Sequence, residues 1–235
     1  MIIAANLKTN FTRSKTQAYI TEIENFLIKK ANTQKVLVFP VASSLIKHTG
    51  KLTIGAQNAH PAFNGAFTGE IAQEQLDEFE IKTILIGHSE RRHIFGETQE
   101  EIVKKFNYYK DLLYKIVYCV GEPLDKREAG HDKMMSYISK QYEGIDTSYK
   151  KLIIAYEPVW AIGTGLTPTL KDIEFIHKEL KEKSLAPLLY GGSIKVTNAK
   201  EVLELKNVDG ILVGSAALYA KHFCTMIQFA QDLEK

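Results

Sequence analysis

The sequence of 235 residues has only two cysteines, no long hydrophobic run and almost no net charge. Cys119 and Cys224 lie far apart and lack metal-ligand spacing, which excludes a disulfide scaffold and favours reduced thiols in a reducing compartment. No stretch approaches the roughly 18 apolar residues that span a bilayer, and the apolar start is too short for a signal peptide. We therefore expect a cytoplasmic protein without a membrane segment.

The charge is also balanced, because the chain has 30 basic and 28 acidic residues and hence a net charge of +2. Without a block of like charge, the chain lacks the electrostatic footprint of a nucleic-acid-binding protein. The seven histidines show no H-x-x-x-H or H-x-H pair, and no acidic cluster has ligand spacing, which disfavours a catalytic metal. The absence of G-x-G-x-x-G after the first apolar run weakens a dinucleotide-binding interpretation.

What the sequence does contain is a regular alternation of short apolar runs and amphipathic segments. Most of the runs lack polar alternation, as expected of parallel strands that are covered on both faces. We count eight, at residues 2–5, 35–39, 52–56, 83–86, 116–120, 152–156, 187–190 and 210–213.

The segments between these runs show helical spacing of apolar residues. Three of the expected helix faces are Tyr19, Ile23, Phe26 and Leu27; Ile102, Phe106, Tyr109 and Leu113; and Ile173, Ile176 and Leu180. No linker or change of composition divides residues 1–235, so the pattern predicts an α/β fold of one domain, a single closed (β/α)8 barrel. An open doubly wound sheet is the alternative.

Polar residues follow the predicted strands at the end where such barrels work. Loops at the C-terminal ends of barrel strands build the active face, so reactive side chains that collect there are informative. Any one of these polar residues, taken alone, could be an ordinary surface residue. They are Asn6 and Lys8 after the first strand, Gln57 and Asn58 after the third, His88, Ser89 and Glu90 after the fourth, Glu157 after the sixth, Gly191, Gly192 and Ser193 after the seventh, and Gly214 and Ser215 after the eighth.

Glu157 is the best candidate for a catalytic base. Pro158 restricts Glu157 to extended geometry, and the glycines at the far end of the following loop give that loop freedom to move. The pattern indicates a base followed by a lid, although an ordinary strand-to-helix connection with an exposed glutamate is the simpler alternative. The expected lid comprises Pro158, Val159, Trp160, Ala161, Ile162, Gly163, Thr164, Gly165, Leu166, Thr167 and Pro168.

His88 stands at the start of a predicted helix, with Ser89 as its expected N-cap and Glu90 in its first turn. The positive end of the helix dipole opposes protonation, so we predict a neutral imidazole that donates a hydrogen bond to a substrate oxygen. The glycines after the seventh and eighth strands expose backbone N–H groups and favour a phosphate dianion.

Together these groups suit proton abstraction next to the carbonyl of a small sugar phosphate. Asn6, Lys8 and His88 could stabilise the negative enediolate. A lid would keep water from the enediol phosphate, which readily loses phosphate.

The sequence resembles the triosephosphate isomerase family over essentially its whole length. Asn6 and Lys8 match, as do residues 55–58, 65–70, 86–92, 95–97, 121–122, 127–130, 156–165 and 190–193. The resemblance implies interconversion of dihydroxyacetone phosphate and glyceraldehyde 3-phosphate without a cofactor, in glycolysis and gluconeogenesis. It implies Glu157 as base, His88 as electrophile, Asn6, Lys8 and Gly163 at the substrate, and Glu90 as a further active-site residue.

The resemblance also implies a homodimer in which the third loop enters the partner's active-site region. Here that loop runs from Asn58 to Glu70, with Thr68 near its tip. An isologous interface would follow, although the loop could instead fold back on its own barrel.

Three departures from the family pattern stand out. Leu7 and Thr9 replace the usual tryptophan and methionine beside Lys8, and Ser215 replaces the second glycine after the eighth strand. The lid ends in Leu166, Thr167 and Pro168, where we expect Thr167 as N-cap and Pro168 as the first helical residue, giving a stiffer hinge.

Two other functions remain open from the sequence. A phosphosugar lyase or another barrel isomerase would share the phosphate loops but should lack the set of Lys8, His88 and Glu157. A non-catalytic phosphate-binding or adhesion protein could have inherited the same barrel.

Overall fold

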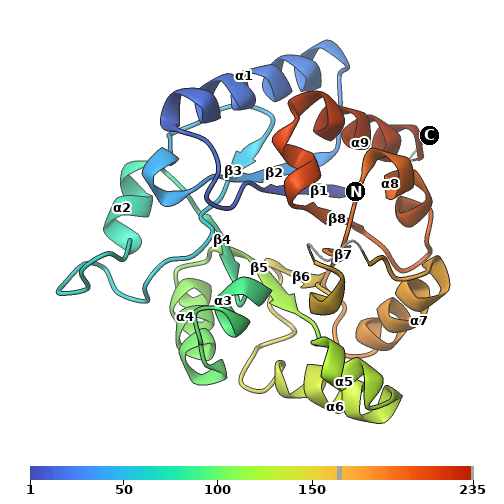
Figure 1. The fold of residues 1–235 in the computed structure, drawn as a ribbon. Helices are drawn as coiled ribbons and strands as arrows, with labels where there is room; N and C mark the ends of the chain where they lie inside the picture. Colours follow the sequence, from blue (N-terminus) through green and yellow to red (C-terminus); the bar gives the residue numbers. More distant parts are fainter. Residues whose placement is uncertain (163–165, 234–235) are drawn as a thin grey trace.

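The computed structural model of the protein, which describes residues 1–162 and 166–233, is built around a ring of parallel strands (Figure 1). The strands are β1 (Ile2–Asn6), β2 (Lys35–Phe39), β3 (Thr53–Ile54), β4 (Thr83–Ile86), β5 (Lys115–Val120), β6 (Leu152–Tyr156), β7 (Leu188–Tyr190) and β8 (Gly210–Val213). Their order in the sheet is β3-β2-β1-β8-β7-β6-β5-β4. A parallel bridge between Ala56 and Ile84 joins the two remaining edges and closes the barrel.

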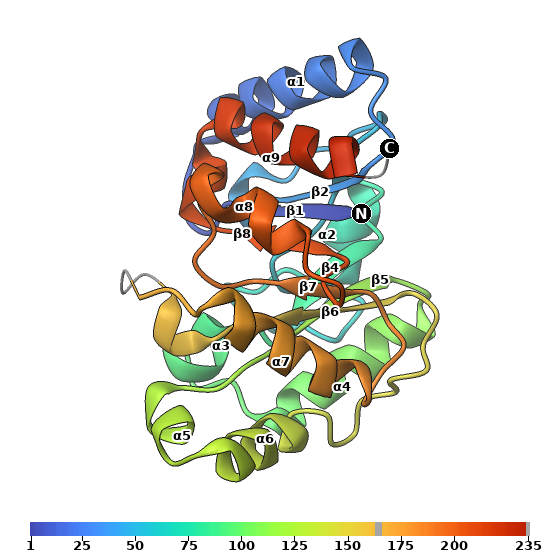
Figure 2. The same cartoon turned by 90° about the vertical axis from the view of Figure 1, so that its right-hand side faces the viewer.

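Helices surround this sheet, as the views of Figures 1 and 2 show. They are α1 (Arg13–Lys29), α2 (Gln73–Glu78), α3 (Ser89–His93), α4 (Gln99–Asp111), α5 (Leu124–Glu128), α6 (His131–Lys140), α7 (Leu170–Lys181), α8 (Val196–Leu203) and α9 (Ala220–Leu233). Short 3₁₀ turns lie at Ala42–Ser44, Val159–Ala161 and Ser215–Leu218. The predicted (β/α)8 barrel and all eight predicted strands are confirmed.

The third strand is shorter than predicted. Regular pairing covers only Thr53 and Ile54, although Gly55 N–H still donates to Val38 O at 2.9 Å. A Cβ at Gly55 would lie 2.3 Å from the Phe39 ring, so the aromatic side chain occupies the space in which a side chain would continue the strand. The Phe39 ring therefore restricts residue 55 to glycine, directly after the last regularly paired residue of the strand.

The core has two parts that follow the alternation of side chains along each strand. The small inner cluster fills the barrel with Ile2, Ala4, Leu37, Phe39, Leu85, Val117, Cys119, Ile153, Ala155, Leu189 and Leu212. A larger cluster lies between strands and helices and contains the buried residues Tyr19, Ile23, Leu27, Ile173, Ile176 and Leu180 of two predicted helix faces. In the described part of the chain, no helix has the length and apolarity that a membrane span requires.

The prediction for the face that ends at Leu113 is wrong at its last residue. Ile102, Phe106 and Tyr109 are buried, but α4 ends at Asp111 and Leu113 is 62% exposed. Leu113 adopts a left-handed conformation with φ of 60°, which turns the chain toward β5. Its spacing is helical in sequence, but the helix has already ended.

His177 of α7 is fully buried between two tyrosines of the sheet. Its ring centroid lies 5.8 Å from that of Tyr156 and 6.1 Å from that of Tyr190, and its Nδ1 lies 3.0 Å from the Asn207 carbonyl. The carbonyl can only accept, so Nδ1 carries a proton, and the lowered pKa of His177 keeps the ring neutral at neutral pH. Burial lowers the pKa of His177 from 6.5 to about 4.

This histidine makes acid unfolding easier. Between pH 6.5 and 4 the unfolded chain binds a proton that the folded chain excludes, so stability falls as the pH falls through this window. The full effect is roughly 3 kcal/mol. In urea denaturation, His177→Asn, which retains a donor for Asn207, should lose less stability than wild type between neutral pH and about pH 4. His222→Asn, at an exposed position, is the control, and an unchanged slope for His177→Asn would contradict the expectation.

Candidate active site

The C-terminal ends of the strands surround a cavity of about 580 Å³ that contains the predicted site residues. Residues from five strands meet there because parallel strands in a barrel all end on the same rim. Its lining includes Asn6, Lys8, His88, Glu90, Glu157, Gly191, Gly192, Ser193, Gly214 and Ser215. Gly163 was also predicted at the substrate, but Gly163, Thr164 and Gly165 lie outside the described residues.

Glu157 lies directly after β6 and is 2% exposed. One carboxylate oxygen, Oε1, lies 3.0 Å from His88 Nε2, and the other, Oε2, accepts the Ser89 N–H at 2.9 Å. Burial raises the pKa of Glu157, but the charge and hydrogen bond of His88, the Ser89 N–H and the charge of Lys8 outweigh it, and the net pKa lies below the ordinary value. Glu157 is therefore ionised in the unliganded protein.

His88 itself is the N-cap of α3, so the prediction of Ser89 as N-cap is wrong. Ser89 is already helical, whereas His88 has φ of −51° and ψ of 142°. This geometry brings Nδ1 within 3.3 Å of the Glu90 N–H, which it accepts. An accepting Nδ1 leaves the proton on Nε2, so the ring donates toward Glu157.

The protonation of His88 depends on where Glu157 lies. Burial lowers the pKa of His88, while the negative charges of Glu157 and Glu90 raise it, and the net direction in this arrangement is upward. Most of the upward contribution comes from Glu157, whereas the backbone N–H at Nδ1 favours the neutral ring. A neutral imidazole is thus favoured when Glu157 turns away from Nε2.

Lys8 reaches the cavity from a strained backbone. Its φ is 50°, a left-handed conformation that is uncommon outside glycine. Its N–H donates to Asn6 Oδ1 at 3.0 Å, its carbonyl accepts from Gln57 Nε2 at 2.8 Å, and its ammonium pairs with Glu90. The role of Gln57 was not assigned from sequence, although its position after the third strand was a signal.

The phosphate-loop candidates, Gly191, Gly192 and Gly214, line the same cavity as Lys8, and a Cβ at Gly214 would lie 3.6 Å from Lys8 Cε. A Cβ at Gly191 would lie 3.0 Å from Glu157 Cγ, and one at Gly192 would lie 2.2 Å from the Tyr190 hydroxyl. The Glu157 and Tyr190 side chains thus leave little room for a side chain at either position. Ser215 begins the 3₁₀ turn after β8 and is exposed there.

The start of the expected lid is anchored by buried polar contacts. Glu122 is fully buried, and its Oε1 accepts from Trp160 Nε1 at 2.9 Å and from the Tyr156 hydroxyl at 3.1 Å. The Arg127 guanidinium lies 4.4 Å from the Trp160 ring centroid and pairs with Asp172 of α7 at 3.1 Å. These contacts connect the lid's first residues to the C-terminal end of β5 and to the first turn of α7.

The predictions for Thr167 and Pro168 at the lid's far end are wrong. Helix α7 begins at Leu170, and its N-cap is Thr169, whose Oγ1 accepts the Asp172 N–H at 3.1 Å. The Asp172 carboxylate accepts the Thr169 N–H at 3.0 Å in return, which completes a capping box. Thr167 has Leu170 three residues later and cannot form this box. Pro168 is buried and precedes the cap.

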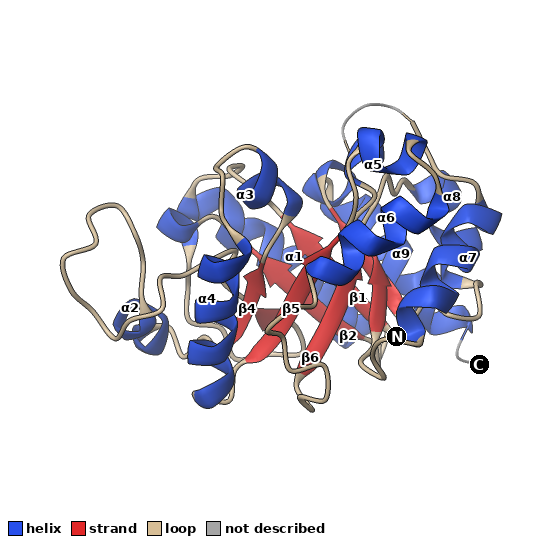
Figure 3. Ribbon diagram, turned by 90° about the horizontal axis from the view of Figure 1, so that it is seen from below, coloured by secondary structure: helices blue, strands red, loops and turns tan. Residues whose placement is uncertain are grey.

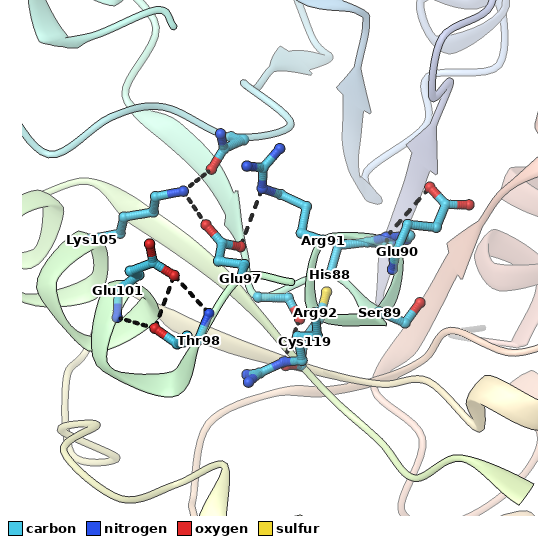
Figure 4. A network of polar contacts seen from close by, with 12 residues as sticks. His88, Ser89, Glu90, Arg91, Arg92, Glu97, Thr98, Glu101, Lys105 and Cys119 are labelled. Carbon is cyan, nitrogen blue, oxygen red and sulfur yellow. Dashed lines mark hydrogen bonds and ion pairs between the residues drawn. The ribbon is translucent and has the colours of Figure 1, made fainter. Parts of the chain in front are cut away.

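A network of ion pairs and hydrogen bonds holds α3 in place (Figure 4). Glu97 accepts from Arg91 Nε at 3.2 Å and pairs with Lys105, which donates to Asn58 at 2.8 Å. Arg92 Nε donates to the carbonyl of Gly87, directly before His88, at 2.8 Å. Among the described residues, no group of three or more His, Cys, Asp or Glu side chains could hold a metal ion.

Comparison with known proteins agrees with this geometry. The family model described as triosephosphate isomerase matches residues 1–230. A triosephosphate isomerase of Sulfurimonas denitrificans is 68% identical over 235 residues, which is 100% of this chain and 98% of the relative. Enzymes of the same name from Sulfurovum sp. and Wolinella succinogenes are 52% and 50% identical, each covering 97% of this chain and 99% of the relative.

The similarity thus extends through every strand of the barrel and every loop of its C-terminal rim. The chain belongs to the triosephosphate isomerase family and interconverts dihydroxyacetone phosphate and D-glyceraldehyde 3-phosphate.

Proposed function

We propose that Glu157 is the base that moves the proton between the two substrate carbons, with His88, Lys8 and Asn6 acting on the substrate oxygens. The observation that carries this assignment is the meeting of Glu157 and His88 at 3.0 Å, on the wall of the cavity that the phosphate-loop candidates also line. A glutamate base beside a neutral histidine is the established pairing in this family.

Abstraction of a proton next to the carbonyl leaves a negative enediolate. The Lys8 ammonium and the Nε2–H of His88 stabilise this charge because both reach the same cavity as Glu157. Asn6 binds the substrate beside Lys8, and Glu90 orients the Lys8 ammonium through their ion pair. In the unliganded protein both oxygens of Glu157 accept hydrogen bonds, so the carboxylate must release at least one donor to reach a substrate carbon.

The substrate phosphate binds between the loops after β7 and β8. Ser193, Gly214 and Ser215 line this part of the cavity, and Gly163 of the lid completes the site. The lid from Pro158 to Pro168 closes over the bound enediolate and keeps water from it, which prevents loss of the phosphate.

Glu157→Gln tests the base directly, because it keeps the size of the side chain and removes the carboxylate. In a coupled assay of triose phosphate interconversion, kcat should fall by about 10³-fold, within the range for loss of a general base. Glu204→Gln, on the exposed end of α8, is the matched control and should match wild type. A wild-type rate for Glu157→Gln would remove the assignment. Phosphate binding by a wild-type protein that does not isomerise would favour a non-catalytic role.

Trp160 offers a test of lid closure, since it is the only tryptophan and lies at the lid's first turn. Closure should alter the contacts of its ring with Glu122 and Arg127. Titration with 2-phosphoglycolate, a phosphate-bearing carboxylate, should therefore change the tryptophan fluorescence in step with binding. Binding measured by calorimetry without any change in fluorescence would argue against closure at this residue.

We also propose a homodimer formed through the third loop. From Asn58 to Glu70 this loop extends away from its own barrel (Figures 1 and 3) and exposes Phe63 and Phe67. A cavity of about 480 Å³ beside the catalytic cavity combines apolar residues, including Val41, Leu45 and Ile94, with Lys8 and Glu90. The loop of a second copy, with Thr68 near its tip, would cover this cavity in an isologous interface.

Phe67→Asp should weaken this dimer because it places a charge in an apolar contact. Sedimentation velocity should show a dimer for wild type and a larger monomer fraction for the variant, with lower specific activity at low protein concentration. Leu185→Asp is the matched control, because Leu185 is 96% exposed and lies at the opposite end of the barrel, before β7. A fully active wild-type monomer would contradict the proposal.

Two further proposals concern the number of domains and the cellular compartment. We infer that residues 1–235 form a single domain, because strands from the two ends of the sequence pair with each other, as in Ile2 with Gly210. Two buried free thiols, Cys119 and Cys224, support a reducing compartment such as the cytoplasm.

A further inference from the structure

The side chain of Gln141 makes a double hydrogen bond to one residue at the edge of the active site. Gln141 is the C-cap of α6, is 6% exposed and does not line the catalytic cavity. Its Oε1 accepts the Gly121 N–H at 2.8 Å, and its Nε2 donates to the Gly121 carbonyl at 2.8 Å. The amide thus binds both polar groups of one residue, as a neighbouring strand would.

Gly121 in turn lies directly against the backbone of Glu157. A Cβ on Gly121 would lie 1.8 Å from the Glu157 carbonyl oxygen, so only glycine permits this approach. The residues on either side complete the contact: Glu157 N–H donates to Val120 O at 2.7 Å, and Val159 N–H donates to Glu122 O at 3.1 Å. The position of the Gly121 backbone therefore determines the position of the Glu157 backbone.

Gln141 is itself held by a second set of bonds. Its backbone carbonyl accepts from the Tyr118 hydroxyl and from Gln99 Nε2, the latter at 2.9 Å. Both partners also bind Arg92, which donates to the carbonyl before His88. One partly buried network thus reaches the backbone beside both His88 and Glu157.

From these contacts we propose that Gln141 is a positioning residue for the isomerisation, acting on the base through the Gly121 backbone. Without its amide, the buried N–H and carbonyl of Gly121 lose their partners, and burial makes an unpaired polar group costly. A glycine has the conformational freedom to turn these groups elsewhere, and Glu157 would move with it. The inference rests on the proposed assignment of Glu157 as base.

Gln141→Met is the primary test, because methionine preserves the size of the side chain and removes both hydrogen bonds. We expect kcat to fall about 10-fold, since small displacements of a base cost much rate. Because the phosphate loops after β7 and β8 do not contact Gln141, KM and competitive inhibition by inorganic phosphate should stay within about twofold of wild type. Affinity for 2-phosphoglycolate should fall in parallel with kcat.

Gln34→Met controls for loss of any buried glutamine. Gln34 is also 6% exposed but lies just before β2, at the opposite end of the barrel. It should lower the thermal midpoint while leaving kcat at the wild-type value in assays well below that midpoint. If Gln141→Met also keeps the wild-type kcat, Gln141 has only a structural role and the proposal fails.

Gln141→Glu provides a second measurement if the methionine variant does not fold. The carboxyl of this variant can donate to the Gly121 carbonyl only when it is protonated. Its kcat relative to wild type should therefore rise as the pH falls from about 8.5 to about 6. A ratio independent of pH would overturn the proposal. Activity of Glu157→Gln in the same assay separates the two hypotheses, because wild-type turnover there would refute the base itself, whatever Gln141 does.

Discussion

The site depends on the two hydrogen bonds that bind the Glu157 carboxylate between His88 and the Ser89 N–H. Glu157 follows β6, whereas His88 and Ser89 follow β4, so the carboxylate reaches across the intervening β5. The Glu157 backbone starts this reach pressed against the end of β5, where Gly121 permits the approach because it has no side chain. The same bonds keep Glu157 ionised despite its burial, which an unpaired carboxylate could not sustain.

Local charge around this contact is arranged so that the state of each group depends on its neighbours. The charge of Glu157 raises the pKa of His88, and His88 lowers that of Glu157. Burial of Cys119 and the nearby Glu157 charge raise the pKa of the Cys119 thiol well above its ordinary value, so this cysteine is a buried apolar neighbour rather than a nucleophile.

Much of the barrel could be predicted because its strands are short apolar runs, and the segments between them have apolar residues at helical spacing. Much of the site could be predicted because polar side chains such as Lys8, His88 and Glu157 directly follow the strands. The errors concern features that spacing does not encode. Leu113 keeps the helical period after the helix has ended, and the choice between Thr167 and Thr169 as N-cap is decided by an acid three residues later. His88 caps its own helix because its Nδ1 accepts the Glu90 N–H. Gln141 carries no sequence signal, since it lies beside Gly121 only after folding.

The closure of the barrel has a consequence for how the molecule opens. Its seam between β3 and β4 consists of a single bridge at Ala56 and Ile84, next to a strand of only two residues, whereas β5 and β6 pair over five. Backbone amides along this seam should exchange with solvent through local separation, while those of β5 and β6 require unfolding of the whole barrel. The edge that carries His88 and the exposed third loop should therefore separate first, whereas Glu157 follows a strand that is paired with its neighbour over five residues.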